Sequence, residues 1–503
     1  MPLEHREVFM SAKHVDVLIV GAGMSGIGVA CHLRRTHPDR SYAILEAREV
    51  SGGTWDLFRY PGIRSDSDMH TFGFGFRPWE SEDSIADGPA ILKYLRETAV
   101  EYGVDQHIIY QRKLVAADWS SERGIWTVEA VRQDNGETEQ YTCNFLLMNT
   151  GYYQHDSGYQ PEFAGRDRYR GEFVHPQFWP EELDYAGKKV VVIGSGATAV
   201  TLVPTMAGTA EHVTMLQRSP TYIVAQPKQD PLDRALRKVL PLSVSYPIVK
   251  WANILKQVAI YKSSKAMPRV IRKGLIRMVA KQLPKGYDVE TDFGPRYNPW
   301  DQRLCLVPDG DLFRSIRNGQ ASVVTDQIDT FTENGIRLRS GKELEADIVV
   351  SATGLNMSAL SGIRASVDGV PVDVSKVVVY RDTMASGVPN FAFTFGYINS
   401  SWTLKVDLTA DFICRLMKHM DEHGYHSVVP QITDPSMKLR RMLDFKAGYM
   451  ERSAQQFPLQ GDRRQWQVRM SYLSDYRALR AAKFDVPELG FSARKKLQAK
   501  AEA

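Results

Sequence analysis

The sequence is poor in cysteine and contains no long apolar run. Four cysteines occur in 503 residues, at positions 31, 143, 305 and 414, and their wide spacing excludes a disulfide framework and a cysteine-rich metal site. The N-terminal stretch MPLEHREVFMSAKH lacks the apolar core of a signal peptide, and no run of 18 apolar residues is available to cross a bilayer. We therefore expect a protein of the reducing cytoplasm.

The overall charge is also low, but it is unevenly distributed. The net charge of +4 does not indicate nucleic-acid binding. Residues 231–285, however, hold thirteen Lys or Arg against one acid, a net of 13 − 1 = +12. Apolar residues at helical spacing, with Pro241, Pro247 and Pro268 between them, predict several short amphipathic helices. These helices either have solvated basic faces or contact an anionic membrane surface that stores a lipophilic substrate.

A strand–turn–helix pattern near the start of the chain predicts a dinucleotide-binding unit. The apolar run VDVLIV ends in a G-x-G-x-x-G turn at Gly21, Gly23 and Gly26. Glycines let the backbone approach a pyrophosphate, which the positive end of the following helix attracts, and Ser25 can donate a hydrogen bond to it. Glu46 ends the next strand, where an acid accepts hydrogen bonds from the ribose hydroxyls. These features predict the unphosphorylated adenosine of FAD or NAD.

The next stretch, SGGTWDLFRYPGIRSDSDM, mixes aromatic and charged residues. Trp55, Phe58 and Tyr60 could belong to a core, but Arg59 and Asp66 are among the charges that alternate with them. Burying such charges without partners is costly. We therefore expect this stretch to border a flat, hydrogen-bonding ring such as a flavin.

A second strand–turn–helix pattern, KKVVVIGSGATAV, is followed by a strand that ends in Arg218 and Ser219 without an acid. The Arg218 guanidinium can donate two parallel hydrogen bonds to a 2′-phosphate, and the Ser219 hydroxyl can add another. This pair therefore favours NADPH over NADH. The alternative is that Arg218 is a solvated strand end. The residues expected to hold NADP are Gly194, Ser195, Gly196, Ala197, Thr198, Ala199, Val200, Arg218 and Ser219.

Two such units predict an α/β protein with two Rossmann-like dinucleotide-binding domains, for FAD and NADPH, and an inserted helical subdomain. The strands FLLMNTG and ADIVVSATG both run into a Thr-Gly, as expected where the chain passes between domains. The stretch NGIRLRSGKELEADIVV predicts a hairpin beside the second sheet. The expected segments are 1–150 and 385–503 for the FAD domain, 151–225 and 301–384 for the NADPH domain, and 226–300 for the basic helical insert.

The absence of certain catalytic motifs from the sequence reduces the number of reactions that the protein could catalyse. A flavoprotein disulfide reductase needs a redox-active cysteine pair, whereas Cys31 and Cys143 are isolated. The chain also has no G-x-S-x-G and no H-E-x-x-H motif. Oxygen is the remaining natural acceptor for the electrons of the flavin.

The stretch YRGEFVHPQFWP resembles the signature of the type I Baeyer–Villiger monooxygenases. Related N- and S-oxygenating flavin monooxygenases usually lack its Trp. The stretches GGTWDLFRYPGIRSDSD, GSGATA, QRSPTYI, NPWDQRLCLVPDGDLF and ATGLN are similar to the same family, so the resemblance covers most of the chain from about Val15. The signature positions are Tyr169, Gly171, His175, Trp179 and Pro180.

The resemblance implies an enzyme in which NADPH reduces FAD and an oxygen atom from O₂ is inserted beside a ketone carbonyl, giving an ester or lactone. Arg303 would supply a fixed positive charge beside the developing negative charge, oriented by Asp66; a purely structural ion pair is the alternative. Arg64, Ser65 and Asp66 would edge the coenzyme. The residues implied for FAD are Gly21, Gly23, Ser25, Gly26, Glu46, Thr54, Trp55, Asp56, Leu57, Asp66 and Leu114.

Two positions depart from the family pattern. Tyr169 stands where Phe is usual, and its hydroxyl needs a partner. Gln302 stands where many relatives have a Lys that helps to bind the NADPH phosphate. Without that Lys, Arg218 is expected to contribute more of the binding to this phosphate. His175 has no accompanying nucleophile and is expected to couple the NADP site to domain closure. Trp402 either lines the substrate or flavin face or packs in the core.

Two other functions stay open on this sequence. One is a flavin-containing monooxygenase that oxygenates nitrogen or sulfur without forming esters. The other is an NADPH oxidase or flavin-binding regulator without oxygenation. The expected partners are O₂ and a lipophilic ketone, sulfide or thioamide, with no nucleic acid. The expected location is the cytoplasm, with a peripheral position at the membrane as the alternative for residues 231–285.

Overall fold

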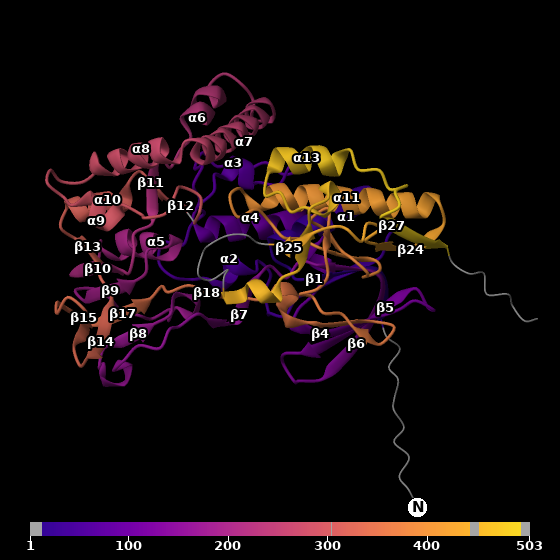
Figure 1. Cartoon of the computed structure of the whole chain (residues 1–503), viewed down its shortest axis with the longest axis horizontal. Helices are drawn as coiled ribbons and strands as arrows, with labels where there is room; N and C mark the ends of the chain where they lie inside the picture. Colours follow the sequence, from indigo (N-terminus) through magenta and orange to yellow (C-terminus); the bar gives the residue numbers. More distant parts are fainter. Residues whose placement is uncertain (1–12, 303, 443–451, 494–503) are drawn as a thin grey trace, which may run out of the picture.

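The computed structural model describes residues 13–302, 304–442 and 452–493 (Figure 1). Its first sheet has nine strands in the order β20-β19-β4-β5-β6-β1-β2-β3, with β23 also paired to β6. The strand β1 lies between β2 and β6 and is parallel to both, and its Val17–Val20 end is buried. The helices α1 and α11 pack against each other over this sheet. The strands of this sheet are β1 (Lys13–Val20), β2 (Tyr42–Leu45), β3 (Ile108–Ile109), β4 (Arg112–Ser120), β5 (Ile125–Arg132), β6 (Thr138–Met148), β19 (Arg364–Val367), β20 (Val370–Pro371) and β23 (Phe391–Phe393).

Helices and short pairs of strands surround the first sheet. The helices are α1 (Met24–Thr36), α2 (Thr54–Leu57), α3 (Met69–Phe72), α4 (Gly88–Glu101), α11 (Trp402–Glu422) and α13 (Tyr472–Arg480). The short strands are β21 (Val379–Tyr380), β22 (Met384–Ala385), β24 (Tyr425–Pro430), β25 (Leu439–Arg441), β26 (Leu459–Gly461) and β27 (Leu489–Ala493). The 3₁₀ turns are η1 (Asp105–His107), η2 (Arg166–Arg168), η3 (Pro176–Phe178), η4 (Ala359–Gly362), η5 (Ala454–Gln456) and η6 (Arg464–Trp466).

The second sheet has five strands in the order β13-β10-β9-β17-β8, all parallel. It contains β8 (Glu172–Val174), β9 (Lys189–Ile193), β10 (His212–Gln217), β13 (Ala321–Thr325) and β17 (Ile348–Ser351), with α5 (Ala197–Met206) and α10 (Asp311–Arg317) beside it. The predicted hairpin is confirmed as β15 (Gly335–Leu338) and β16 (Glu343–Glu345), extended by β14 (Ile328–Thr332). The mixed first sheet, in which β1, β2, β3, β6 and β23 pair in parallel, and the all-parallel second sheet, each with helices beside it, confirm the predicted fold class.

The two Thr-Gly stretches lead into a pair of linker strands between the sheets. β7 (Tyr153–Gly158) follows β6, β18 (Leu355–Met357) follows β17, and the two linkers pair in antiparallel orientation. The chain then re-enters the first sheet at β19, which pairs with β4. This re-entry lies upstream of residue 385, where we expected the FAD domain to resume. The domain boundaries themselves stay a prediction.

The basic segment is helical, as predicted, but it is less fragmented than we expected. The predicted insert, residues 226–300, contains α6 (Pro231–Arg237), α7 (Leu242–Ala266), α8 (Pro268–Ala280) and α9 (Val289–Phe293). The strands β11 (Tyr222–Gln226) and β12 (Leu304–Pro308) flank these helices and pair in parallel. Pro241 and Pro268 stand at helix starts, whereas Pro247 lies inside α7. Pro247 is in the second turn, where a missing N–H costs only one hydrogen bond close to the helix end. Among the described helices, none is both long and apolar enough to cross a membrane.

A buried ion cluster joins α11, α13 and the turn between β21 and β22. The Lys405 ammonium on α11 lies 2.6 Å from an Asp382 oxygen and 2.9 Å from an Asp475 oxygen. Tyr397 donates a hydrogen bond to the same Asp475 oxygen at 2.8 Å. Lys405 is fully buried, and burial raises the pKa of Asp382 to about 6. The ammonium is therefore needed to keep the two carboxylates in the interior.

Replacing Lys405 with Met should destabilise the protein by about 3–5 kcal/mol, because two carboxylates stay buried without their cation. The loss should shrink at pH 5 relative to pH 8, because burial raises the pKa of Asp382 above its value in the unfolded chain and protonation of this carboxylate relieves the penalty as the pH falls. Chemical denaturation at both pH values measures this. The control is Lys418→Met on the same helix, whose exposed pairing with Glu422 at 3.9 Å is worth less than about 0.5 kcal/mol. Equal losses in the two variants would contradict the role of Lys405.

Candidate active site

A cavity of about 1080 Å³ lies beside the first glycine turn. Its walls come from the β1–α1 turn, the loops around residues 52–55 and 65–68, the β6–β7 connection, the loop before α11, and the helices α7 and α8. Single ligand sites usually measure about 300–1,000 Å³. The cavity is therefore large enough for an extended cofactor together with a substrate.

The first glycine turn brings backbone very close to backbone. A Cβ on Gly26 would lie 1.8 Å from the Gly21 carbonyl oxygen, and a Cβ on Gly21 would lie 2.7 Å from the Asn149 oxygen. Gly21 also has a φ of +97°, which favours glycine. The helix α1 starts at Met24, so its N-terminal N–H groups are available to an anion at the cavity wall. This geometry fits a pyrophosphate.

The Ser25 hydroxyl at this turn is held by a residue from the far end of the chain. The Trp402 indole Nε1–H donates to Ser25 Oγ at 2.7 Å, which leaves the Ser25 O–H free to donate elsewhere. The Trp402 ring also packs on Tyr152, with centroids 5.1 Å apart. Trp402 therefore lines the cavity and also packs against a neighbouring ring. The sequence had left these two roles, lining the substrate or flavin face and core packing, as alternatives.

Glu46 is buried at the end of β2 and lines the cavity. Its carboxylate oxygens accept hydrogen bonds from Ala22 N at 2.7 Å and Arg48 N at 3.0 Å. Burial raises the pKa of Glu46, and these backbone donors oppose that shift. Leu114 on β4 lines the same cavity. The structure therefore brings both predicted adenosine-binding residues to one site.

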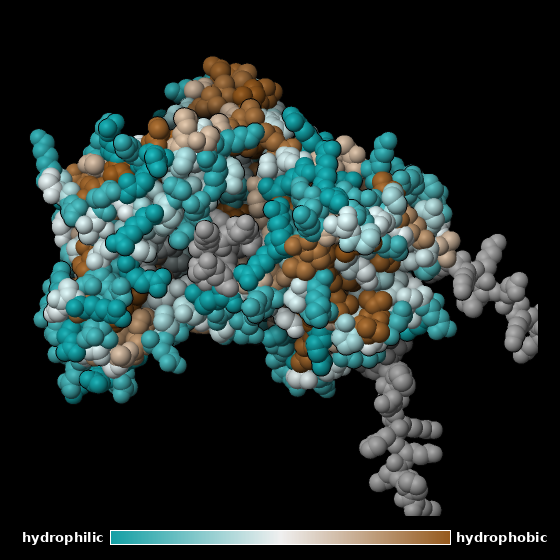
Figure 2. Space-filling model, viewed as in Figure 1, coloured by the Kyte–Doolittle hydropathy of each residue, from teal (hydrophilic) through white to brown (hydrophobic). Residues whose placement is uncertain are grey.

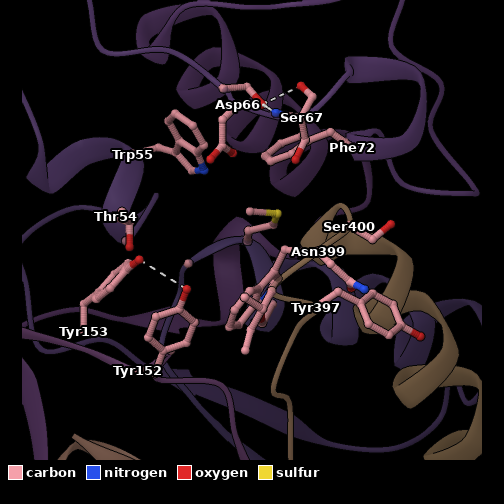
Figure 3. Close-up of a pocket in the computed structure, with 18 of the residues that line it drawn as sticks. Thr54, Trp55, Asp66, Ser67, Phe72, Tyr152, Tyr153, Tyr397, Asn399 and Ser400 are labelled. Atoms are coloured by element: carbon pink, nitrogen blue, oxygen red, sulfur yellow. Dashed lines mark hydrogen bonds between the residues drawn. The ribbon is translucent and has the colours of Figure 1, made fainter. Parts of the chain in front are cut away.

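The segment 52–68 divides between the cavity and the core. Thr54, Trp55, Ser65 and Asp66 line the cavity. Trp55 and Asp66 lie across the cavity from Tyr152, Tyr153 and Tyr397 (Figure 3). Tyr152 and Tyr153 belong to no motif recognised in the sequence, although they directly follow the Thr150-Gly151 pair after β6. Together these rings form walls that suit a flat aromatic ligand.

Several other residues of this segment lie outside the cavity lining. Leu57, Phe58 and Tyr60 pack in the core of the second sheet, so the core interpretation is right for Phe58 and Tyr60. Asp56 is buried and pairs with Arg48 at 2.5 Å and Arg96 at 2.8 Å.

Two arginines of this segment are also paired with distant acids. Arg64 pairs with Asp311 at 2.5 Å and is not among the cavity-lining residues. Arg59 pairs with Glu181. The charges between the aromatics therefore have ion-pair partners, some of them far apart in sequence.

The second glycine turn lies at the carboxyl end of the second sheet, outside the cavity lining. Gly194 has a φ of +142°, and a Cβ there would lie 2.4 Å from the Ala352 oxygen. The Ser195 hydroxyl donates to the Ser219 carbonyl oxygen at 3.1 Å and lies 2.9 Å from the Thr221 hydroxyl. Arg218 is exposed beside this turn. The structure therefore brings the turn and the Arg218–Ser219 pair together, as a phosphate site requires.

The signature stretch lies on the linkers. His175 Nε2 is 3.3 Å from the Gly354 carbonyl oxygen, next to β18, and the Gln177 amide donates to the carbonyls of residues 154 and 155 in β7 at 2.8 and 3.0 Å. Burial lowers the pKa of His175, which favours the neutral imidazole. Trp179 packs against the second sheet, while Pro180 is exposed. These contacts agree with a coupling role.

The Tyr169 hydroxyl has the partner that the sequence required. It donates to the Ala346 carbonyl oxygen at 3.0 Å, just before β17. A Cβ at Gly171 would lie 2.3 Å from this hydroxyl and 2.4 Å from the Asp347 oxygen. The close packing explains why glycine follows two residues after the aromatic ring.

Arg303 lies outside the described residues. Trp300 and Leu304, on either side of it, both line the cavity. Asp66 lines the same cavity. Described residues on both sides of position 303 therefore reach the cavity that Asp66 lines.

Family comparisons agree with this site. Residues 84–422 match the family model for flavin-binding monooxygenase-like proteins. The chain belongs to this family. Residues 19–83, which include the first glycine turn, match an NAD(P)-binding Rossmann-like domain.

Named relatives of this flavin-binding monooxygenase-like protein cover nearly the whole chain. It is 52% identical to the FAD-containing monooxygenase EthA of Mycobacterium tuberculosis, over 96% of this chain and 98% of EthA. It is 51% identical to a probable FAD-binding monooxygenase AlmA of Acinetobacter baylyi, over 95% of this chain and 96% of AlmA.

Solved structures share the fold at low identity. A steroid monooxygenase bound to NADP superimposes with a TM-score of 0.70 at 21% identity, covering 83% of this chain and 88% of that one. The cyclohexanone monooxygenase from Rhodococcus bound to NADP⁺ gives a TM-score of 0.70 at 18% identity, covering 84% and 87%. The architecture of this flavin-binding monooxygenase-like protein is thus that of a known monooxygenase fold.

Gly158→Ala should disturb the linker contact of this family member, because the new Cβ would lie 2.0 Å from His175 Cε1. We expect a loss of about 1–3 kcal/mol in unfolding free energy from this overpacking. The same change at Gly274, a helical glycine with no atom within 4 Å of a built Cβ, should stabilise α8 by up to about 1 kcal/mol. Denaturant titration of both variants provides the check, and an unchanged Gly158→Ala protein would argue against the tight contact.

Proposed function

We propose that this protein is an FAD- and NADPH-dependent Baeyer–Villiger monooxygenase that converts ketones into esters or lactones and also oxidises sulfides or thioamides. The observation that carries the proposal is the signature ending in Trp179-Pro180, whose His175 and Gln177 contact the two linkers. An N- or S-oxygenating flavin monooxygenase without ester formation is the second candidate, because the same fold family supports it.

The residues at the cavity fit FAD. The glycine turn and α1 would hold the pyrophosphate, Glu46 the ribose, and the wall of Trp55 and Tyr152 the flavin ring. When bound, FAD reduced by NADPH supplies the activation of O₂. Solved relatives were described with FAD and NADP together, which supports the assignment of both cofactors.

In this proposal the chain contributes a fixed charge and a dry pocket. The Arg303 guanidinium stays protonated at any working pH and stabilises negative charge on the substrate oxygen without reorganisation. Asp66 is the proposed orienting carboxylate. The aromatic walls exclude water, which strengthens these interactions.

Arg218 is proposed to select NADPH. It is exposed next to Ser219 at the end of β10, where a 2′-phosphate would lie if the coenzyme followed the usual path across the second glycine turn. A lipophilic ketone partitions into lipid, so the proposed substrate class is compatible with a peripheral position of the protein at a membrane.

A panel of linear and cyclic ketones, with product analysis, tests the reaction. Wild-type protein should form ester in proportion to the NADPH consumed. Arg303→Ala should retain bound FAD and flavin reduction but lose about 10²–10³ in the rate of ester formation. Arg296→Ala is the matched control, since Arg296 is exposed and absent from the cavity lining. Sulfoxide without any ester would favour the second candidate, and hydrogen peroxide alone would exclude both.

Arg218→Ala should raise the KM for NADPH by about 10–100-fold, because one charge-assisted hydrogen-bonding partner is lost. The KM for NADH should stay nearly constant, since NADH has no 2′-phosphate. Steady-state kinetics with both coenzymes measures the change. Equal effects on NADPH and NADH would show that Arg218 does not contact the 2′-phosphate.

A further inference from the structure

The helix α7 has two functional sides. Asn253, Gln257 and Ile260 line the cavity. Asp68, beside the proposed flavin site, accepts hydrogen bonds from the Asn253 amide at 3.2 Å and the Gln257 amide at 2.7 Å. These bonds fix the inner side of α7 against the cavity.

The outer side of α7 is an exposed apolar stripe of Val244, Ile248, Trp251 and Leu255, between 39% and 53% accessible. Their spacing of four, three and four residues places them on one face, opposite the cavity side. Figure 2 shows hydrophobic residues gathered at the top of the molecule, over α6 and α7. Val239, before α7, is 75% exposed and extends this surface. We call the four residues of α7 the outer stripe.

Exposed basic side chains lie before and after the outer stripe in sequence and on the neighbouring helix α8. Lys238 and Lys262 flank it in sequence, and α8 adds Arg269, Lys273 and Arg277, all exposed. None of these five forms an ion pair with another residue in the described part of the chain. A row of apolar residues with free cations beside it is the pattern of a helix that lies in the membrane interface.

Aromatic residues at one edge of the outer stripe also favour a membrane interface as the partner. The Trp251 ring packs edge-on against Tyr476 of α13, with centroids 5.6 Å apart, and lies 6.1 Å from the Tyr472 ring. Trp and Tyr are enriched where lipid headgroups meet hydrocarbon, because their rings are amphipathic.

The charge distribution favours anionic lipid over a second copy of the chain. Residues 231–285 carry +12 and the whole chain carries +4, so the remainder carries 4 − 12 = −8. A symmetric dimer through the outer stripe would bring two +12 surfaces together, which is unfavourable. An anionic bilayer attracts each Lys or Arg near its surface.

The cavity opens beside this helix. Val270 and Met278 of α8 line the cavity and are 63% and 48% exposed, and Ile260 of α7 is likewise both lining and exposed. The cavity mouth between α7 and α8 is therefore apolar and reaches the surface.

We propose that the outer stripe of α7 and its flanking bases dock the protein on an anionic phospholipid bilayer, so that lipid-dissolved substrate enters through the mouth between α7 and α8. The docking surface stands independently of the chemistry, while substrate entry rests on the proposed monooxygenase function.

Co-sedimentation of the FAD-loaded full chain with vesicles tests the docking surface. Wild-type protein should pellet with vesicles of equal phosphatidylglycerol and phosphatidylcholine, remain in solution with phosphatidylcholine alone, and dissociate in about 0.5 M salt. Ile248→Glu with Leu255→Glu should lower the bound fraction by at least about 10-fold, because two charges enter the lipid-facing stripe.

The matched control carries the same added charge elsewhere. Val100→Glu with Val370→Glu changes two residues that are 63% and 67% exposed on α4 and β20, and it should bind vesicles like the wild type. Equal loss in both double variants, or no wild-type binding, would overturn the proposal. A dimer in analytical ultracentrifugation that only the α7 variant dissociates would assign the outer stripe to a second copy instead.

Substrate entry has its own measurement. With a long-chain methyl ketone dissolved in the anionic vesicles, the α7 double variant should lose at least about 10-fold in rate, since it no longer reaches the lipid. With a short water-soluble ketone it should match the wild type, because the outer stripe lies outside the cavity. Equal rates on both ketones would overturn entry from lipid. Absence of ester from every ketone, with vesicle binding intact, would reject the proposed function and leave the docking surface standing.

Discussion

The pairing of β7 with β18 is the constraint on which the arrangement of the two sheets depends. The chain crosses between the sheets twice, and the two crossings form one antiparallel pair. Gln177 and His175 attach the signature stretch to this pair through carbonyl groups of both linkers. Any change in the angle between the sheets must move these contacts. These contacts support the prediction that the signature couples the geometry of the two sheets, and that role stays a prediction.

The cavity depends on segments that are distant in sequence. The Trp402 indole holds Ser25, so the first glycine turn is completed by the first residue of α11, which follows the return of the chain from the second sheet. The buried Lys405 cluster then ties α11 to Asp475 on α13. A folded first sheet alone would lack the cavity wall that α11 supplies. Formation of the site therefore depends on the folding of the C-terminal part of the chain.

The helical insert connects this site to the surface. Asp68 accepts hydrogen bonds from the inner side of α7, while the outer stripe of the same helix faces solvent. A helix whose one face is polar and bonded cannot rotate to bury the other face. The exposed apolar residues are therefore a fixed property of the surface, and the concentration of positive charge in residues 231–285 gives this surface a preferred partner.

The sequence by itself determined the parts of this protein that rest on local rules. Gly21 and Gly26 were recognisable because only glycine permits their backbone contacts, and buried parallel strands such as VDVLIV are read from short apolar runs. Only the tertiary structure decided which polar residues reach the cavity. Arg64 and Asp56 resemble their neighbours in sequence, yet ion pairs with Asp311 and Arg96 draw them away. Tyr152 and Tyr153 gave no signal, since an aromatic pair in a linker becomes a cavity wall only when distant segments close around it. Charge pairing and cavity walls are long-range properties, and local spacing does not encode them.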